Sequence, residues 1–421
     1  MKRILCILAF LALATAATAE EHVYFGNLHS HTSYSDGSGT PEEAYRHARD
    51  VAKLDFLAIT EHNHAQAEDQ ASPDRKDGIL IAKDHSLYED LKKTAARFNK
   101  DGEFIAIYGQ EVSSIAKGNH MNVFEVANVV DEKAVPNGRF DLLFKAWLPG
   151  HPDSTGQPPV VQLNHPYFRS TDHYWLEYGQ DDFPSREDWL KALESNVRTI
   201  ELRNGPAMAR DSGHKPEEFF EPQFLKFLGM GLRVAPSADQ DNHYKTWGTV
   251  TDARTGIVAD ALTKPKLLEA LRQRHVYATD DKDLQMVFKV DGHLAGDAID
   301  PAPAAKSALD IQYRLSDVDE PNASYKIQVW SGSCGLSPVA GVVQEFPVAA
   351  GEATGQWKRL SGIRYFPGYA YIFFKVLQSD GDRAWSAAVW FGPRPTAPAG
   401  AGPEPQPKTK PKRHRKRAAH R

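Results

Sequence analysis

The stretch His29-Ser30-His31, followed by Asp36, constrains this chain more than any other. In an extended backbone the residues on either side of Ser30 point the same way, so both imidazoles can face one point. Asp36 adds an oxygen donor to two nitrogen donors, and such a mixed set suits a divalent metal ion. The H-x-H pattern alone also fits two packed or surface histidines, so the choice depends on partners elsewhere in the chain.

Polar residues recur at the ends of the segments that we expect to be buried strands. Besides the opening histidines they are His62, Glu111, His120, His165 and Asp239, with Asp241 and His243 just beyond the last strand end. Each residue alone is more simply explained as a satisfied polar group in a loop. As an explanation of the whole set, however, it would require the same coincidence at five or six separate strand ends. We therefore predict that they form one shared metal site.

Strand-like and helix-like segments alternate up to about residue 280. The expected strands are 23–28, 55–60, 103–108, 121–126, 160–163, 198–202 and 232–236. The expected helices are 41–54, 87–99, 185–193, 217–228 and 264–274. The first helix is the best signalled, with Thr40 as N-cap, Pro41 in the first turn and Glu43 three residues after the cap. Such repeated units predict a parallel α/β barrel over residues 20–280, whose strand ends share one face.

The pattern changes after Thr279, where short alternating runs replace the helices. The runs are 285–290, 307–314, 324–330, 357–360, 370–376 and 384–390. Turn sequences such as Asp291-Gly292 separate them. This predicts a small antiparallel β-sandwich over residues 281–392, which braces the barrel or contributes a lip to its site.

Five motifs follow one another in a fixed order along about residues 22–280. They are the H-x-H with a downstream Asp, Thr60-Glu61-His62-Asn63, a Glu followed by a His, Asn164-His165-Pro166, and Ser237-Ala238-Asp239. In residue type, order and position relative to strands, these motifs resemble the polymerase and histidinol phosphatase (PHP) superfamily. Within this superfamily, the N-terminal export signal (residues 1–19) and the domain after the barrel (residues 281–392) look more like the branch that contains carbamate hydrolases and secreted phosphoesterase-like proteins.

The resemblance implies a distorted, TIM-like (β/α)7 barrel holding two or three divalent metal ions. Carried over residue by residue, the first metal would be bound by His29, His31, Glu111 and Asp239. Glu111 would bridge to a second metal bound by His120 and His165. Asp36 and His62 would hold a third metal with a histidine from the last motif.

The last motif departs from the family pattern, which is usually Asp-x-His. This chain reads Asp239-Gln240-Asp241-Asn242-His243. Either Asp241 replaces the imidazole, or His243 reaches back, or the register is Asp241-Asn242-His243. Glu61 stands where Asp is usual, which changes the reach of the carboxylate but need not alter metal binding.

Mixed nitrogen and oxygen ligands suit Zn, Mn or Fe, and a hydroxide shared by two such ions is nucleophilic near neutral pH. The expected reaction is hydrolysis, most simply of a phosphate ester, with carbamate, ester or amide hydrolysis as the alternative. Asp239, Asp241 or His243 could serve as a general acid if it is not a ligand. A metal-stabilised binding protein without activity is the remaining interpretation.

Candidate substrate contacts are arginine and asparagine side chains that follow the strand ends. Arg203 and Asn204 follow one strand end, and Arg169 follows the Asn-His-Pro motif. Each could hold an anionic group of a small phosphate ester or carbamate substrate by a hydrogen bond. The alternative for each arginine is a surface charge or a structural ion pair.

The N-terminus predicts export. Lys2 and Arg3 precede an apolar run, and Ala17-Thr18-Ala19 is an A-x-A cleavage site, so residues 1–19 are typical of a signal peptide. We expect a secreted or periplasmic protein with no membrane-spanning segment in the mature chain. The mature chain would keep one cysteine, Cys334, which cannot form an internal disulfide.

Residues 393–421 form a Pro- and Ala-rich basic tail that is expected to be disordered. Removing the eight Lys and Arg charges from residue 408 onward takes the net charge from −5 to −13, so residues 1–407 are acidic. The tail would either touch anionic envelope polymers or be a solvated extension. We expect that deleting residues 408–421 leaves turnover unchanged and affects only retention on anionic surfaces.

Overall fold

The computed structural model describes residues 20–63, 81, 84–113, 120–136, 138–166, 178, 182–216, 218–335 and 338–393. The predicted signal peptide, Arg169 and the basic tail lie outside these residues.

The N-terminal two thirds of the described chain alternates strands with helices, as the sequence predicts. Its strands are β1 His22–Asn27, β2 Phe56–His62, β3 Ile105–Val112, β4 Met121–Phe124, β5 Val161–Leu163, β6 Val197–Asn204, β7 Glu218–Phe219, β8 Ala235–Ala238, β9 Arg254–Ala259 and β10 Val276–Thr279. Its helices are α1 Pro41–Asp50, α2 His85–Phe98, α3 Phe140–Leu142, α4 Arg186–Asn196, α5 Glu221–Gly229 and α6 Lys264–Gln273. A π-helical turn, Leu143–Trp147, and a 3-10 turn, Leu148–Gly150, follow α3.

The strands of this part form a mixed sheet in the order β10-β9-β1-β2-β3-β4-β5-β6-β8. β1, β2 and β3 are parallel to one another, as are β5, β6 and β8. β4 runs antiparallel between β3 and β5, and β9 runs antiparallel to β1. The α/β class is therefore confirmed, while the sheet is mixed where the sequence predicts a parallel barrel.

The two ends of this sheet meet through a side chain rather than through a backbone ladder. Thr255 Oγ1 of β9 accepts the N–H of Ala238 in β8, the last strand of the sheet, at 3.0 Å. Among the described strands no ladder joins β8 to β9 or β10. A closed ring of seven strand–helix units is therefore not confirmed.

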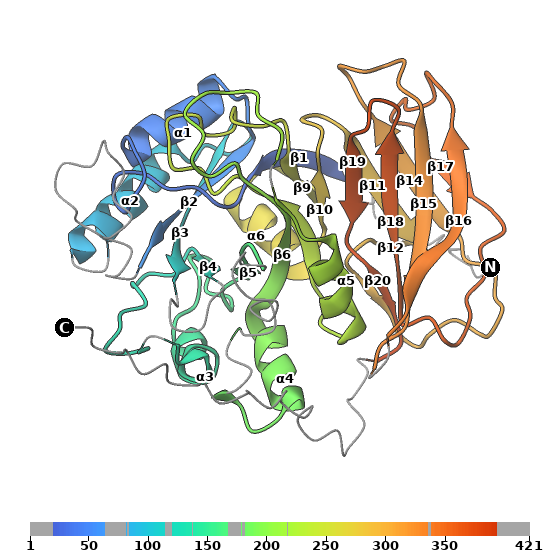
Figure 1. Ribbon diagram of the computed structural model, residues 1–421, viewed down its shortest axis with the longest axis horizontal. Helices are drawn as coiled ribbons and strands as arrows, with labels where there is room; N and C mark the ends of the chain where they lie inside the picture. The colour runs from blue at the N-terminus through green and yellow to red at the C-terminus, as the bar shows by residue number, and fades with distance from the viewer. Residues whose placement is uncertain are drawn as a thin grey trace, which may run out of the picture.

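The C-terminal part consists of strands that are antiparallel except where β13 pairs with β20, and Figure 1 shows it beside the α/β part. The strands are β11 Gln285–Val290, β12 His293–Leu294, β13 Ala298–Ile299, β14 Ile311–Ser316, β15 Tyr325–Gly332, β16 Ala340–Val348, β17 Lys358–Leu360, β18 Tyr371–Gln378, β19 Arg383–Ser386 and β20 Val389–Phe391. A separate sheet, β12-β11-β14-β17, faces β15 and β18 across a buried core. Phe288 of one sheet stacks on Phe374 of the other, with ring centroids 4.1 Å apart.

The two parts share a sheet and a core. β10 pairs with β19 in register from Tyr277 opposite Ser386, so the sheet continues from the first part into the second. Phe224 of α5 packs edge-on against Phe373 of β18, with ring centroids 5.7 Å apart. The parts on either side of residue 280 are thus joined by one sheet and one core.

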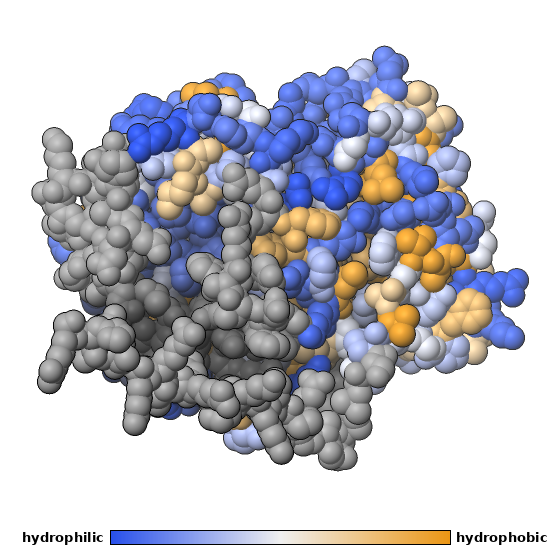
Figure 2. Space-filling view, in the orientation of Figure 1, coloured by the Kyte–Doolittle hydropathy of each residue, from blue (hydrophilic) through white to orange (hydrophobic). Residues whose placement is uncertain are grey.

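Exposed apolar side chains are found mainly in the antiparallel part of the described chain. The space-filling view shows apolar spots separated by hydrophilic residues over the antiparallel part (Figure 2). The most exposed are Val339 at 71% and Val318 at 70%. Single exposed residues of this kind need no binding partner to explain them. No helix in the described part of the chain is long and apolar enough to cross a membrane.

Candidate metal centre

The H-x-H segment continues from β1 as extended chain. Ser30 accepts the N–H of Thr60 at 2.8 Å, and the N–H of His31 donates to the carbonyl of Asn242 at 2.8 Å. Because both edges of this segment are bonded, the two imidazoles leave it on one face. Their Nε2 atoms lie 3.2 Å apart. The geometry expected from the sequence for His29 and His31 is therefore present.

A first group of ligand atoms surrounds these two nitrogens. Asp241 Oδ1 lies 3.2 Å from His29 Nε2 and 3.1 Å from His31 Nε2. The Glu111 carboxylate lies 3.3 Å from each of the same nitrogens. His29, His31 and Glu111 are fully buried, so the group could hold one ion away from bulk solvent.

A second group forms around the other side of Glu111, at the end of β3. His120 Nδ1 lies 3.0 Å from Glu111 Oε1, and His165 Nε2 lies 3.1 Å from the same oxygen. His62 Nδ1 lies 2.9 Å from Glu111 Oε2. His62, Glu111 and His120 offer ligand atoms close enough to share an ion. Asn164 supports the group by donating to Glu111 Oε1 at 2.9 Å.

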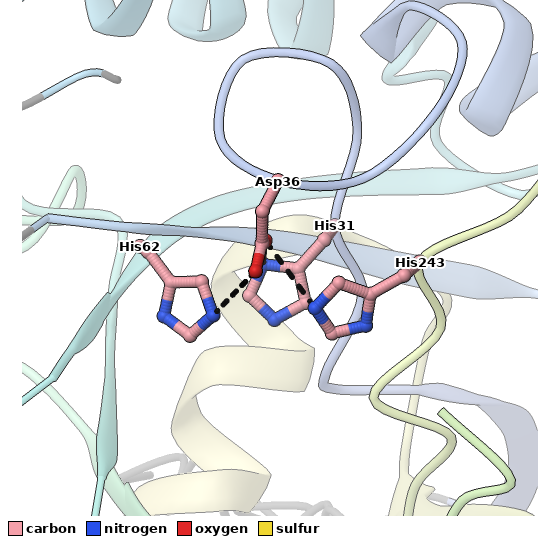
Figure 3. Close-up of side chains that lie close together, drawn as sticks. All are labelled: His31, Asp36, His62 and His243. Atoms are coloured by element: carbon pink, nitrogen blue, oxygen red, sulfur yellow. Dashed lines mark ion pairs between the residues drawn. The ribbon is translucent and has the colours of Figure 1, made fainter. Parts of the chain in front are cut away.

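A third group centres on Asp36. Figure 3 shows His62 and His243 on either side of its carboxylate, with His31 close by. His243 Nε2 lies 3.3 Å from Asp36 Oδ1, and His62 Nε2 lies 3.5 Å from Asp36 Oδ2. Glu61 holds the loop that carries Asp36, because its carboxylate accepts hydrogen bonds from Thr32 and Ser35.

The three groups overlap in their members. His31 belongs to the first and third groups, Glu111 to the first and second, and His62 to the second and third. Ions bound to two groups that share a ligand side chain would lie close together, because the same side chain would contact both. The arrangement is therefore one compound centre rather than three separate sites.

Several buried atoms of the centre lack a hydrogen-bond partner within the described residues. They are Asp36 Oδ2, Glu111 Oε2, Asp241 Oδ1 and His165 Nδ1. Buried polar atoms of native proteins are normally satisfied, and oxygen and imidazole donors together match Zn, Mn or Fe. The residues present therefore fit divalent ions.

Charges inside the centre shift its pKa values strongly. Burial lowers the pKa of His62 and His243, but the surrounding carboxylates together outweigh burial and raise both values to about 9, Asp36 with Glu111 at His62 and Asp36 with Asp241 at His243. Burial likewise opposes the hydrogen bond and charge of Glu111 at His165, whose pKa also rises to about 9. In each case a carboxylate favours a positive charge on the ring.

The carboxylates show the reverse effect. Burial favours their neutral form, yet His29 and His62 hold the pKa of Glu111 well below its usual range. The pKa values of Asp36 and Asp241 are lowered by the same kind of neighbour. The centre is thus built for positive charge among ionised carboxylates, which is the charge that divalent ions supply.

Asp239 has a different role from the one that the sequence analysis gives it. Its Oδ1 accepts the N–H of Leu28 at 2.6 Å and the hydroxyl of Thr255 at 3.1 Å. Its Oδ2 accepts the amide of Gln162 at 3.0 Å. With these oxygens occupied, Asp239 joins none of the three groups, and Asp241 stands in its predicted place.

This geometry selects one of the three readings of the last motif. Asp241 lies in the first group and His243 in the third, two positions apart, which corresponds to the register Asp241-Asn242-His243. Asp241 has φ of +48°, so the chain turns at this ligand instead of continuing the β8 strand. Asp239 therefore lies within the sheet and not at the centre.

Glu201 is a buried residue of the centre that the sequence analysis does not identify. Its Oε1 lies 2.7 Å from His29 Nδ1, on the side of the ring away from the first group. Its Oε2 accepts from Asn204 Nδ2 at 2.7 Å and from the N–H of His165. Its signal in the sequence is a glutamate inside a segment, 198–202, that is expected to be a buried strand.

Of the three predicted substrate residues the structure describes Arg203 and Asn204, and each contacts an acidic side chain. Arg203 Nε pairs with Asp280 Oδ1 at 2.7 Å, and its guanidinium lies 5.3 Å from the centre of the Phe219 ring. The structure thus places Arg203 in an ion pair with Asp280, which is the alternative that the sequence analysis gives for this arginine. Asn204 is buried against Glu201, and Arg169 lies outside the described residues.

A further acidic group, Asp281, Asp283 and Asp317, lies where the α/β and antiparallel parts meet. Gln378 donates to Asp281 at 2.9 Å and to Asp317 at 3.2 Å, and Tyr325 donates to Asp317 at 2.7 Å. These hydrogen bonds give the group a structural explanation.

Similar sequences occur in Chlamydia, and no family model matches the chain. An uncharacterized protein of Chlamydia muridarum is 22% identical over 393 residues, covering 88% of this chain and 57% of that protein. One of Chlamydia trachomatis is 22% identical over 418 residues, covering 89% and 58%. The chain thus spans less than two thirds of the length of these relatives.

Among solved structures, the chain is similar to a two-domain protein of Bacteroides vulgatus, described as containing a predicted PHP-like metal-dependent phosphoesterase. The TM-score is 0.43 and the identity 14%, covering 87% of this chain and 95% of that one. At this TM-score the likeness decides neither fold nor activity. The centre has to be interpreted from its own residues.

Proposed function

We propose that this protein is a metal-dependent hydrolase whose substrates are phosphate esters. The observation that carries the proposal is the overlap of three ligand groups through His31, Glu111 and His62. Closely spaced divalent ions are typical of enzymes that displace a group at phosphorus, because both the attacking and the leaving oxygen need stabilisation. When bound, such ions would lower the pKa of water and neutralise charge on the phosphoryl oxygens.

The residues of the chain would bind and orient the metal ions and exclude bulk water from them. Glu111 would join the first and second groups, and Asp241 would complete the first. The imidazole of His243 is almost fully buried and faces Asp36, so it would act as a ligand before it could act as a general acid. Two serine hydroxyls contact imidazoles of the centre, Ser113 at 2.6 Å from His62 Nδ1 and Ser35 at 3.3 Å from His31 Nδ1. We assign both imidazoles to the metal ions, so that activated water rather than a serine is the nucleophile.

The test compares metal-free and metal-loaded protein on three substrates. Protein stripped with a chelator is reloaded with Zn²⁺, Mn²⁺ or Fe²⁺ and assayed on p-nitrophenyl phosphate, bis-p-nitrophenyl phosphate and a naphthyl carbamate. We expect phosphate ester hydrolysis that disappears on stripping and returns on reloading. Hydrolysis of the carbamate alone would keep the metal centre but change the substrate class to the alternative reaction.

A double variant, His29→Ala with His31→Ala, should lose bound metal and turnover together, because it removes half of the first group. The matched control is His214→Ala with His275→Ala, whose rings pair with Asp211 and Asp297 outside the centre. Full turnover in the first double variant, or no bound metal in the unaltered protein, would refute the proposal.

We also propose that the chain is exported, on the basis of the N-terminal pattern alone. N-terminal sequencing of the protein from expressing cells should then begin at Glu20. Retention of Met1 in a cytoplasmic fraction would contradict this.

A further inference from the structure

Glu201 lies directly behind two residues of the proposed centre. It is fully buried in β6, and one carboxylate oxygen lies 2.7 Å from Nδ1 of His29. The other oxygen accepts the backbone N–H of His165 and the amide of Asn204, the latter at 2.7 Å. One side chain thus reaches a residue from the first ligand group and a residue beside the second.

The contact with His29 fixes which nitrogen of that ring is available. A carboxylate at Nδ1 favours the proton on that nitrogen, which leaves the lone pair on Nε2. Nε2 is the atom that faces Glu111 and Asp241, at 3.3 Å and 3.2 Å. Glu201 therefore holds the tautomer and the ring orientation that ligation by His29 requires.

The contact with His165 acts on the backbone. His165 has φ of +25°, a conformation that residues other than glycine seldom adopt. Its N–H is held by Glu201 while its Nε2 reaches Glu111 Oε1 at 3.1 Å. Without the carboxylate, both the buried N–H and the unusual backbone conformation would lose a support.

We propose that Glu201 is a positioning residue that presets His29 and His165 together, so that its loss weakens metal binding at both places. The inference rests on the proposed function, since it needs a metal at the centre. It goes further because one carboxylate that is not itself a proposed ligand would position two residues of the centre, His29 and His165.

Glu201→Gln is the informative variant because it conserves shape. A carboxamide has one oxygen and one NH₂ group, so it cannot accept hydrogen bonds at both ends from His29 and His165 as the carboxylate does. We expect roughly 10- to 100-fold weaker binding of Zn²⁺, measured by calorimetry against a competing chelator. In NMR spectra of the Zn²⁺-loaded protein, the Nδ1–H proton of His29 should also lose the downfield shift that a hydrogen bond to a carboxylate gives it.

Glu221→Gln is the matched control. Glu221 is another buried glutamate, and it pairs with Lys375 at 2.8 Å away from the centre. This variant should bind Zn²⁺ as the unaltered protein does, even if it is less stable. Thermal unfolding of both variants separates loss of folding from loss of positioning.

The outcomes distinguish the two proposals. If the unaltered protein binds no Zn²⁺, the proposed function and this inference both fail. If it binds Zn²⁺ and Glu201→Gln binds it with equal affinity and an unchanged His29 spectrum, only the inference about Glu201 is overturned. An equal loss of affinity in Glu221→Gln would also overturn it, because a general effect of removing a buried charge would then explain the result.

Discussion

Asp239 and Asp241 show at the scale of single residues how two like side chains acquire different roles. Asp239 is surrounded by donors from Leu28, Thr255 and Gln162, and it ties the ends of three strands together. Asp241 has imidazoles as its nearest partners. The first arrangement stabilises the fold, whereas the second leaves an oxygen for a cation.

Substituting the two aspartates should separate stability from metal binding. We expect Asp239→Asn to lower the free energy of unfolding by roughly 1–3 kcal/mol, because an NH₂ group would face donors that the carboxylate accepts. Asp241→Asn should weaken metal binding roughly 10- to 100-fold with a small effect on the metal-free fold. Urea unfolding and metal analysis of both variants measure this, and the reverse pattern would restore Asp239 as the ligand.

Cys334 lies beside the end of β15, and burial raises the pKa of its thiol to about 11. Its Sγ donates to the carbonyl of Leu228 at 3.3 Å. Because the folded-state pKa lies above the ordinary value of 9.0, the thiol stays protonated through neutral pH and ionises only as the pH approaches 11.

Alkylation of Cys334 by iodoacetamide at pH 8 should therefore be slow in the folded protein. The raised pKa alone predicts about 100-fold less thiolate than an ordinary thiol has. A Cys6→Ser background leaves Cys334 as the only cysteine. Urea should restore rapid alkylation, and equal rates with and without urea would argue against a buried, protonated thiol.

Helix α1 shows at the scale of an element how local sequence sets a boundary beside the centre. Thr40 accepts the N–H of Glu43 at 3.2 Å, and Glu43 accepts the N–H of Thr40 at 2.8 Å, which completes the predicted capping box. Lys245 bonds Glu43 at 2.9 Å and so links the cap to the segment after His243. The cap begins the helix just after the loop that carries Asp36.

Thr40→Ala should cost about 1 kcal/mol in the free energy of unfolding, because it leaves a helix N–H without its acceptor. Thr40→Ser keeps the hydroxyl and serves as the control. Chemical denaturation of the metal-free protein gives the difference. If alanine and serine at this position are equally stable, the capping box contributes nothing measurable.

The α/β and antiparallel parts behave as one unit at the scale of the whole molecule. Asp280 pairs with Arg203 at 2.7 Å and with Arg383 at 3.1 Å, joining β6 to β19. Both guanidinium groups also contact the Phe219 ring, with their central carbons 5.3 Å and 4.9 Å from its centre. This contact and the continuous sheet predict a single cooperative unfolding transition.

Asp280→Ala should destabilise the molecule by roughly 3–5 kcal/mol, because it leaves two partly buried guanidinium groups without their shared carboxylate. Lys215→Ala is the control, since its ion pair with Asp382 is largely exposed and should contribute less than about 1 kcal/mol. Thermal and urea unfolding give both values. Two separate transitions in the unaltered protein would contradict the shared core.

Much of the architecture was predictable because its signals are local. The alternation of apolar and polar residues located β11, β14, β15 and β18. The capping residues located α1, and the serine at position 185 located the start of α4. Strands β9 and β10 were missed because they are short apolar segments without distinctive caps or turns.

The sequence by itself determined which residue types stand at the strand ends, and with them the chemistry of the centre. Only the tertiary structure decided that Asp241 rather than Asp239 faces the histidines, that Glu201 stands behind His29, and that Arg203 belongs to an ion pair. The physical reason is that a ligand is defined by where its side chain points. That direction depends on backbone turns, such as the positive φ of Asp241, and on partners distant in the chain.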